Sequence, residues 1–234
     1  MSALIILPTY NEKDNIRPLL EKILHVDSDS HVLVVDDDSP DGTGRIAGEM
    51  TASFPRVHVL RRTGDRGRGL AGVDGFKYAL DHGYNPVLEM DADFSHNPED
   101  IPRFLEAIKN HDVVIGSRFV KGGGEEGRPF YRRGLSIAAN VFIRRVLKIP
   151  IKDCTSGFRC FRRKVLESIV WDQVVSEGPS IVEEMLYRCA QLRCDIFEIP
   201  ILFTKRKSGK SKLEFFKILG VLFFVTNFKR KTAQ

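Results

Sequence analysis

Two aspartates separated by one residue, Asp91 and Asp93, are the clearest candidates for chemistry in this sequence. The apolar run 87–90 before them predicts a buried strand, and Asn97-Pro98-Glu99-Asp100 after them predicts the start of a helix. The pair would then lie where a strand ends and a loop begins, the edge where open α/β sheets bind ligands. Two carboxylates there suit a hard divalent cation whose other ligands are phosphate oxygens. The plainer alternative is a strand end with an aspartate that caps the next helix.

Strand and helix patterns alternate on both sides of this pair. Short apolar runs that end at turn signals predict strands over residues 4–7, 31–35, 57–60, 87–90 and 112–116, and later over 158–161 and 196–203. Apolar residues at helical spacing predict helices near residues 16–24, 43–53, 70–82, 101–108, 134–147 and 180–192. This order predicts an α/β fold, with a mostly parallel sheet and helices on both of its faces.

The composition is that of a globular domain with a basic surface. The 234-residue chain is 42% hydrophobic, enough for one substantial core with a small appendage. A formal net charge of +5 favours an anionic ligand or a membrane surface without choosing between them. The four cysteines form no CxxC pair, and the apolar run at residues 3–7 is too short for an export signal. We therefore expect reduced cytosolic thiols and no zinc site.

Two short motifs match known binding patterns only in part. Residues 67–72 have the GxGxxG spacing of dinucleotide-binding loops, and Asp91 lies at about the distance of a ribose-binding acid. That fingerprint should close the first strand directly, whereas residues 61–66 separate this one from the third predicted strand. Residues 37–42 resemble the start of an EF-hand loop, but Gly48 stands where the bidentate glutamate is required. The sequence therefore favours neither a dehydrogenase nor an EF-hand protein.

Polar segments follow in the second half of the chain. Residues 119–133 contain three consecutive glycines and mixed charges, and we expect a mobile lid over a site rather than a plain surface insertion. Residues 206–212 form a strongly basic loop. The stretch 213–228 holds five phenylalanines, has basic residues on both sides, and contains an apolar run too short to span a bilayer. It predicts a helix in the interface of an anionic membrane, or one packed on the sheet or on a partner subunit.

Polar motifs close the principal strands in a fixed order. They are Pro8-Thr9-Tyr10-Asn11-Glu12, Asp36-Asp37-Asp38-Ser39-Pro40-Asp41-Gly42-Thr43, Asp91-Ala92-Asp93 and Gly116-Ser117-Arg118, with Arg206 and Lys212 in the late basic loop. In this order the sequence resembles the family-2 glycosyltransferases of the GT-A fold over nearly its whole length, and most closely the dolichyl-phosphate or polyprenyl-phosphate mannose synthases. The resemblance implies a Rossmann-like GT-A catalytic domain over residues 1–212 and a membrane-interfacial helix within 213–234.

The resemblance also implies a role for each of these positions. Asp91, Ala92 and Asp93 match the segment that meets the sugar and the metal-bound diphosphate. The guanosine part of the donor would be held by Pro8, Tyr10, Glu12, Val35 and Asp37. Phosphate-binding positions match Arg118, Arg206 and Lys212, and an arginine that receives the lipid phosphate matches Arg132. Taken singly, each of these residues has a plainer explanation as packing or as surface charge.

Two positions depart from the family pattern. Many relatives carry glutamine two residues after the second aspartate as a further metal ligand, but here Ser95 stands there. A hydroxyl is a weaker ligand, so the expected metal ligands are Asp93, Asp91 and Ser95, with water or His96 as alternatives. Relatives also often carry Phe-Gln-x-Glu in the later helix, where residues 181–184 read Ile-Val-Glu-Glu and only Glu184 carries over.

The implied reaction is transfer of mannose from GDP-mannose to a dolichyl or polyprenyl phosphate, with inversion at the sugar carbon. It needs no strong general base, because a phosphate monoester with a second pKa of about 6 is largely dianionic at neutral pH. Arg118 and Arg132 would position this phosphate by bidentate contacts. Asp93 would hold Mg²⁺ or Mn²⁺ against the leaving GDP, and Asp91 would position the sugar.

The implied setting is the cytoplasmic face of a membrane, with peripheral attachment, a membrane subunit as a further partner and no nucleic acid. One alternative is a sister transferase that moves glucose or a modified pentose from a UDP donor to the same lipid. The run Asp-Asp-x-Ser-Pro-Asp-Gly-Thr favours the mannose branch. The other alternative is a non-catalytic module that binds nucleotide sugars, which the intact aspartate pair and the arginines disfavour.

Overall fold

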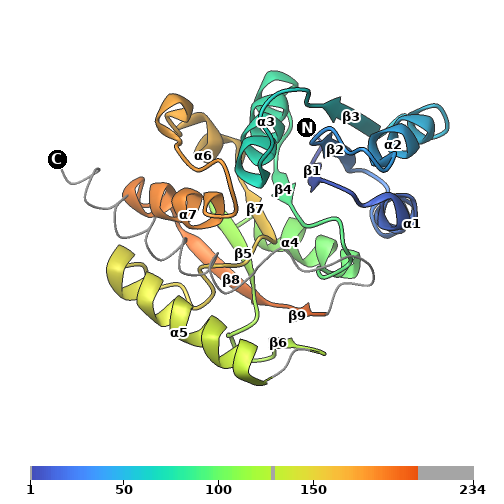
Figure 1. Ribbon diagram of the computed structural model, residues 1–234. Coiled ribbons are helices and arrows are strands. Elements are labelled where there is room, and N and C mark those ends of the chain that lie inside the picture. The colour runs from blue at the N-terminus through green and yellow to red at the C-terminus, as the bar shows by residue number, and fades with distance from the viewer. Residues whose placement is uncertain (1, 128–129, 205–234) are drawn as a thin grey trace.

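The computed structural model describes residues 2–127 and 130–204 (Figure 1). The strands are β1 (Leu4–Thr9), β2 (His31–Asp36), β3 (Val57–Arg61), β4 (Val87–Glu89), β5 (Val113–Ser117), β6 (Gly124–Glu125), β7 (Arg159–Phe161), β8 (Ile196–Pro200) and β9 (Leu202–Phe203). The α-helices are α1 (Lys13–Val26), α2 (Thr43–Thr51), α3 (Arg68–Asp81), α4 (Ile101–Ala107), α5 (Phe130–Leu147), α6 (Arg163–Glu167) and α7 (Ile181–Gln191), and two 3₁₀ turns are η1 (Pro98–Asp100) and η2 (Trp171–Gln173).

Within these residues the main sheet has seven strands in the order β3-β2-β1-β4-β7-β5-β8. Strands β1 to β4, and β5 with β8, pair in parallel, whereas β7 runs antiparallel between β4 and β5. The carboxyl ends of β1, β2, β4 and β5 therefore meet at one edge, where α/β sheets bind ligands. The amino end of β7 reaches the same edge, so the loop before it joins the motifs expected there.

Both faces of the sheet are covered, which explains why its strands read as continuous apolar runs. Alternate side chains of β1 enter different cores: Leu4 and Ile6 pack with α3, α5, α6 and α7, while Ile5 and Leu7 pack with α1, α2 and α4. In Figure 1, α5, α6 and α7 lie together on one side of the central strands, away from α1 and α2. The predicted α/β architecture with helices on both faces is confirmed.

A second, small sheet joins two distant parts of the chain. Strand β6, from the glycine-rich segment after β5, pairs in parallel with β9, which follows β8 after one residue. The register places Gly124 opposite Leu202 and Glu125 opposite Phe203. This sheet sets the position of Glu125 and of the chain that leads towards the late basic loop.

The structure differs from three of the predicted elements. The expected loop 119–133 contains β6, and helix α5 begins at Phe130 rather than near residue 134. The expected strand 196–203 is interrupted after Pro200, because a proline donates no hydrogen bond to a neighbouring strand, and its two halves join different sheets. The short helix α6 and the turn η2 were not predicted. The helix expected over 213–228 lies outside the described residues.

Candidate functional site

The loop after β4 holds the acidic pair in a compact turn. The Asp93 side chain is buried, and its Oδ1 accepts a hydrogen bond of 3.0 Å from the backbone N–H of Ser95. The Oγ of Ser95 is also buried and makes no hydrogen bond with the described residues. Mg²⁺ and Mn²⁺ bind oxygen ligands of this kind, a carboxylate and a hydroxyl that has no hydrogen-bond partner among the described residues. The donor set therefore fits the predicted metal, although no cluster of three or more His, Cys, Asp or Glu side chains that could hold a metal occurs among the described residues.

His96 packs against this turn and is hydrogen-bonded to its backbone. Its Nδ1 accepts a hydrogen bond of 3.1 Å from the backbone N–H of Asp91, which places the ring proton on Nε2. The ring stacks on Phe158 with a centroid distance of 4.9 Å, and burial lowers the pKa of the imidazole. His96 is thus a neutral support of the acidic loop, and Ser95 is the better placed of the two candidate ligands.

A series of ion pairs connects Arg159, Glu89 and Arg68 to Asp91. Glu89 is fully buried at the end of β4 and accepts from Arg159 at 2.7 Å and from Arg68 at 3.1 Å. The same Arg68 guanidinium donates to Asp91 Oδ1 at 3.3 Å. Because the Arg68 guanidinium balances the charge of Asp91, this carboxylate is better suited to bind a neutral sugar than to act as a second metal ligand.

Sequence reasoning missed Arg68, since it lies within the GxGxxG match at 67–72, which was set aside as a false dinucleotide motif. The structure shows what the glycines do instead. A Cβ atom at Gly69 would lie 2.1 Å from the carbonyl oxygen of Ser176, and one at Gly67 would lie 2.2 Å from that of Glu177. The glycines let the loop before α7 lie against the start of α3, where the Glu177 carbonyl accepts from the Gly69 N–H at 2.8 Å. An arginine between such glycines is the signal that could have identified it.

The expected nucleoside residues lie together at the ends of β1 and β2. Asp37 accepts from the Gly67 N–H at 2.7 Å and forms an ion pair with Arg62. The Arg66 guanidinium lies over the Tyr10 ring, with its Cζ 5.2 Å from the ring centroid. Glu12 accepts from Asn15 at 2.7 Å at the start of α1. Tyr10 and Glu12 are half-buried here, whereas Asp37 is buried with both carboxylate oxygens bonded to Arg62 and Gly67.

Two of the three other predicted contacts, Val35 and Ala92, have buried side chains. Val35 is fully buried in the core, and its backbone carbonyl accepts from the Thr9 hydroxyl at 3.1 Å. Ala92 is almost fully buried, while Pro8 is partly exposed at the carboxyl end of β1. Val35 and Ala92 could reach a ligand only through their backbone atoms, and their ligand contacts stay a prediction.

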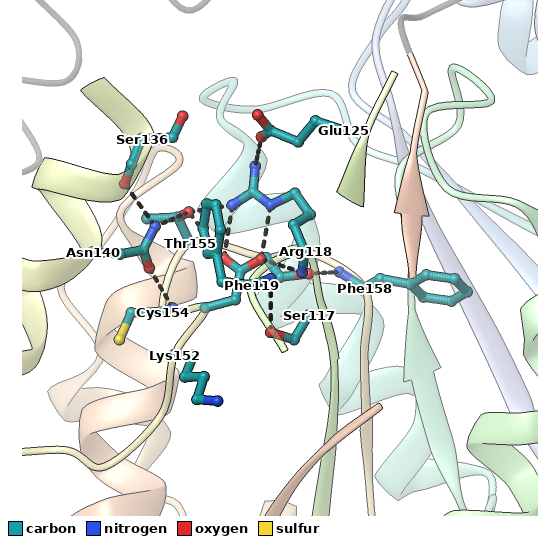
Figure 2. A network of polar contacts seen from close by, with 12 residues as sticks. Ser117, Arg118, Phe119, Glu125, Ser136, Asn140, Lys152, Cys154, Thr155 and Phe158 are labelled. Atoms are coloured by element: carbon teal, nitrogen blue, oxygen red, sulfur yellow. Dashed lines mark hydrogen bonds and ion pairs between the residues drawn. The ribbon is translucent and has the colours of Figure 1, made fainter. Parts of the chain in front are cut away.

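Arg118, at the end of β5, lies in a dense polar network (Figure 2). Its Nε and Nη2 donate to the two carboxylate oxygens of Asp153, each at 2.7 Å, and Nη2 also donates to the Thr155 hydroxyl at 2.6 Å. Its Nη1 donates to Glu125 Oε1 at 3.1 Å. In this structure Asp153 occupies the bidentate face of the guanidinium, and the phosphate-binding role of Arg118 stays a prediction.

A hollow of about 370 Å³ lies between Arg118 and helix α5. Its lining contains four cations and an apolar wall: Arg118, Phe119, Val120, Gly123, Arg133, Ile137, Asn140, Val141, Arg144 and Lys152. The side chains of Arg133, Arg144 and Lys152 make no hydrogen bond or ion pair with any described residue. Unpaired cations beside an apolar wall suit an amphiphilic anion.

Three predicted residues cannot be placed by their side chains. Arg132 belongs to the first turn of α5, close to the hollow, and only its backbone is described. Arg206 and Lys212 lie outside the described residues. The chain leads to them from Thr204, whose Oγ1 donates to the Phe94 carbonyl at 3.0 Å and whose N–H donates to the Ser95 carbonyl at 3.2 Å. The late basic loop thus starts from a point fixed to the acidic loop.

Helix α7 carries two buried glutamates with different surroundings. Glu184 accepts from the Ser176 N–H at 2.9 Å and pairs with Arg188 at 2.8 Å, which ties the loop before α7 to the helix. Burial raises the pKa of Glu183 to about 7, although Arg159 and Arg68 oppose this shift. Only Glu184 had been carried over from the family pattern, and its role in this chain is structural.

Glu183 should make stability fall as pH rises. Its raised pKa favours folding most below the ordinary value near 4.5, and this contribution is lost as pH rises through about 7. We expect Glu183→Gln to be more stable than the wild type at pH 8, by on the order of 3 kcal/mol at 1.36 kcal/mol per pKa unit. Urea unfolding at pH 5 and pH 8 measures this, with Glu167→Gln on α6 as an exposed control. A difference between variant and wild type that does not change with pH would contradict the assignment.

None of the helices among the described residues combines the length and the apolar character needed to cross a bilayer.

Comparisons with known proteins agree with this geometry. The family model described as "Glycosyl transferase family 2" matches residues 4–170. The chain is 41% identical to a polyprenol monophosphomannose synthase of Mycolicibacterium smegmatis, over 95% of this chain and 85% of that protein. It is 43% identical to an undecaprenyl-phosphate mannosyltransferase of Micrococcus luteus, over 91% and 88%. It is 40% identical to a dolichol-phosphate mannosyltransferase of Pyrococcus furiosus, over 92% of this chain and 60% of that protein.

The fold is also similar to a solved structure of low sequence identity. Glucosyl-3-phosphoglycerate synthase of Mycobacterium tuberculosis, crystallised with Mn²⁺, UDP and glucosyl-3-phosphoglycerate, superposes with a TM-score of 0.69 at 16% identity, over 98% of this chain and 79% of that one. The sheet, with acidic and basic motifs at one edge, defines a glycosyltransferase of the GT-A type. The chain belongs to glycosyl transferase family 2, as the order of its motifs had predicted.

Proposed function

We propose that this protein transfers mannose from GDP-mannose to a polyprenyl phosphate, giving polyprenyl-phosphate mannose and GDP with inversion at the sugar carbon. The proposal rests mainly on the identity of 40–43% between this chain and three relatives. They are named polyprenol monophosphomannose synthase, undecaprenyl-phosphate mannosyltransferase and dolichol-phosphate mannosyltransferase. The site supports it, because a nucleoside-sized edge, an acidic loop and a basic amphiphilic hollow follow one another along the sheet.

The chain's own residues would divide the work by position. Tyr10, Glu12 and Asp37 would hold the guanosine, while Arg68 and Asp91 would orient the sugar. Asp93, with Ser95, would hold a divalent cation that balances the charge developing on the leaving diphosphate. Arg206 and Lys212, which follow the anchored Thr204, would add positive charge at the same diphosphate.

The acceptor side would use the hollow beside α5. A phosphate monoester is largely dianionic at neutral pH, so it needs to be positioned rather than deprotonated. Arg132, Arg133, Arg144 and Lys152 would supply that charge, and the apolar wall formed by Ile137 and Val141 would receive the first carbons of the lipid. Mg²⁺ and Mn²⁺ are both compatible with the carboxylate and hydroxyl donors of the acidic loop.

We also propose a peripheral location on the cytoplasmic face of a membrane. The acceptor is a lipid, and the described surface of α5 exposes Leu135, Ile137 and Phe142 among basic residues. The segment 213–234 would add an interfacial helix. A membrane subunit that binds this helix is a further part of the proposal.

A donor-by-acceptor assay tests the reaction, and the donor arm is a prediction of its own. We expect GDP release from GDP-mannose only when polyprenyl phosphate is present, and no UDP release from UDP-glucose. By calorimetry GDP should bind at least about tenfold more tightly than UDP, a difference of roughly 1.4 kcal/mol. Equal or reversed affinities would assign the protein to the sister transferases that use UDP-sugars. Nucleotide binding without sugar transfer would leave only a binding module.

A further inference from the structure

Arg118 lies between two buried carboxylates, which the fold holds in different ways. The Arg118, Asp153 and Glu125 side chains are 8%, 0% and 1% exposed, respectively. In Figure 2 the Arg118 guanidinium points towards Glu125 on one side and towards Thr155 on the other. Within this trio of described side chains, two carboxylates face one guanidinium. A phosphate dianion brought to it would be repelled unless one carboxylate left.

Asp153 is the fixed partner. Besides holding the guanidinium in a bidentate pair, its Oδ2 accepts from the Arg118 backbone N–H at 2.9 Å. Its own N–H donates to Glu198 on β8 at 3.0 Å, and the next N–H, of Cys154, donates to Asn140 on α5 at 2.6 Å. Moving Asp153 would therefore break contacts with β5, β8 and α5 together.

Glu125 lies in a different backbone setting from Asp153. It lies on the two-residue strand β6, whose backbone is tied to its neighbour by the hydrogen bonds Gly124 N–H to Ile201 O at 3.0 Å and Glu126 N–H to Phe203 O at 2.8 Å. Gly122 and Gly127, on either side, have φ values of +90° and +68°. These are left-handed conformations that glycine adopts at little cost, so a glycine turn lies on each side of the short strand.

The charges around the pair indicate where a competing anion would come from. Arg133, Arg144 and Lys152 line the hollow beside Arg118 and have no partner among the described residues. An anion that enters this hollow meets three unbalanced cations first, and Arg118 next. Only a ligand that also outcompetes Glu125 gains the Nη1 donor of Arg118.

We propose that Glu125 is an internal competitor of the acceptor phosphate for Arg118, and that it selects phosphate monoesters over diesters. The inference rests on the proposed function, in which the acceptor is a polyprenyl phosphate. The arriving monoester is a dianion and displaces the Glu125 carboxylate from Nη1. Transfer forms a bond between a phosphate oxygen and the sugar carbon, and GDP leaves with the electrons of the broken bond. The product is a diester with one negative charge, so Glu125 regains Arg118 and promotes product release.

Removing the charge of Glu125 should strengthen acceptor binding. Loss of a carboxylate with only a structural role would instead weaken binding or leave it unchanged. In Glu125→Gln the side chain keeps its shape and one acceptor oxygen for Arg118, so the fold is expected to persist. We expect the KM for polyprenyl phosphate to fall roughly tenfold, inhibition by the product to become stronger, and the KM for GDP-mannose to stay unchanged. Glu126→Gln removes the same charge from the next residue, which is exposed and does not touch Arg118, and serves as the matched control.

An unchanged or increased acceptor KM in Glu125→Gln would overturn the inference, as would an equal fall in the Glu126→Gln control. No transfer by the wild type would refute the proposed acceptor and the inference with it, whereas transfer with unchanged acceptor KM would refute the inference alone. Hydrogen exchange of the wild type gives an independent readout. A short-chain isoprenyl phosphate should speed exchange of the Gly124 and Glu126 amides, and GDP alone should not. Exchange that is unchanged or slowed by the isoprenyl phosphate would also overturn the inference.

Discussion

Replacing Asp93 by alanine is expected to lower sugar transfer roughly a thousandfold while the protein stays folded. A divalent cation at the diphosphate contributes several kcal/mol to stabilisation of the leaving group, and each 1.4 kcal/mol corresponds to a factor of ten in rate. Asp93 is the buried carboxylate of the acidic loop, next to the buried Oγ of Ser95. Without it the diphosphate would face Asp91 and the rest of the loop with no cation between them. The measurement is GDP release with saturating GDP-mannose and polyprenyl phosphate.

A second variant separates the metal from the loop. Asp93→Asn keeps an acceptor oxygen for the Ser95 N–H, so it preserves the turn but removes the charge. If Asp93 holds the cation, Asn should be nearly as inactive as Ala, and Mn²⁺ should no longer raise the melting temperature of the GDP complex. If Asp93 only shapes the loop, Asn should restore activity. Undiminished turnover of the wild type in EDTA would contradict the metal assignment altogether.

The parts of the fold that sequence reasoning predicted well are those where one local pattern decides the outcome. The parallel strands β1, β2 and β5 are short apolar runs closed by turn signals, and each was predicted to within about two residues at either end. The position of β7 was predicted, but not its antiparallel place between β4 and β5. That place depends on pairing over long sequence distances, such as Leu88 with Cys160, and a single strand's pattern carries no information about it.

The candidate site divides in the same way. The place of Asp91 and Asp93 after a predicted strand identifies them as candidates, whereas Arg118, Tyr10 and Glu12 are predicted from the family resemblance. Their partners come from elsewhere in the chain: Arg68 from α3, Arg159 from β7, Asp153 from the loop before β7, and Glu125 from β6. Charged residues inside apolar segments show no period of their own. Only the fold brings them together.

Loss of Glu89 should be the most destabilising single change in this network. Glu89 and Arg159 are buried side by side, and Arg68 reaches the same carboxylate. Glu89→Ala would leave the Arg159 guanidinium in the core without an anion, and removal of one partner of a buried pair costs about 3–5 kcal/mol. Urea unfolding should show this loss. Glu167→Ala, which removes one partner of the surface pair with Arg163, should cost no more than about 0.5 kcal/mol.

The double variant Glu89→Met with Arg159→Met tests whether the loss comes from an unbalanced charge. Apolar side chains of similar volume can replace a buried ion pair at little cost, so the double variant should be more stable than Glu89→Ala by at least about 2 kcal/mol. It should still bind the donor poorly. Glu89→Met would remove one of the two carboxylates that contact the Arg68 guanidinium, and Asp91, the proposed sugar-binding residue, would follow the movement of Arg68. Recovery of stability together with full donor affinity would show that Asp91 does not depend on this buried network for its position.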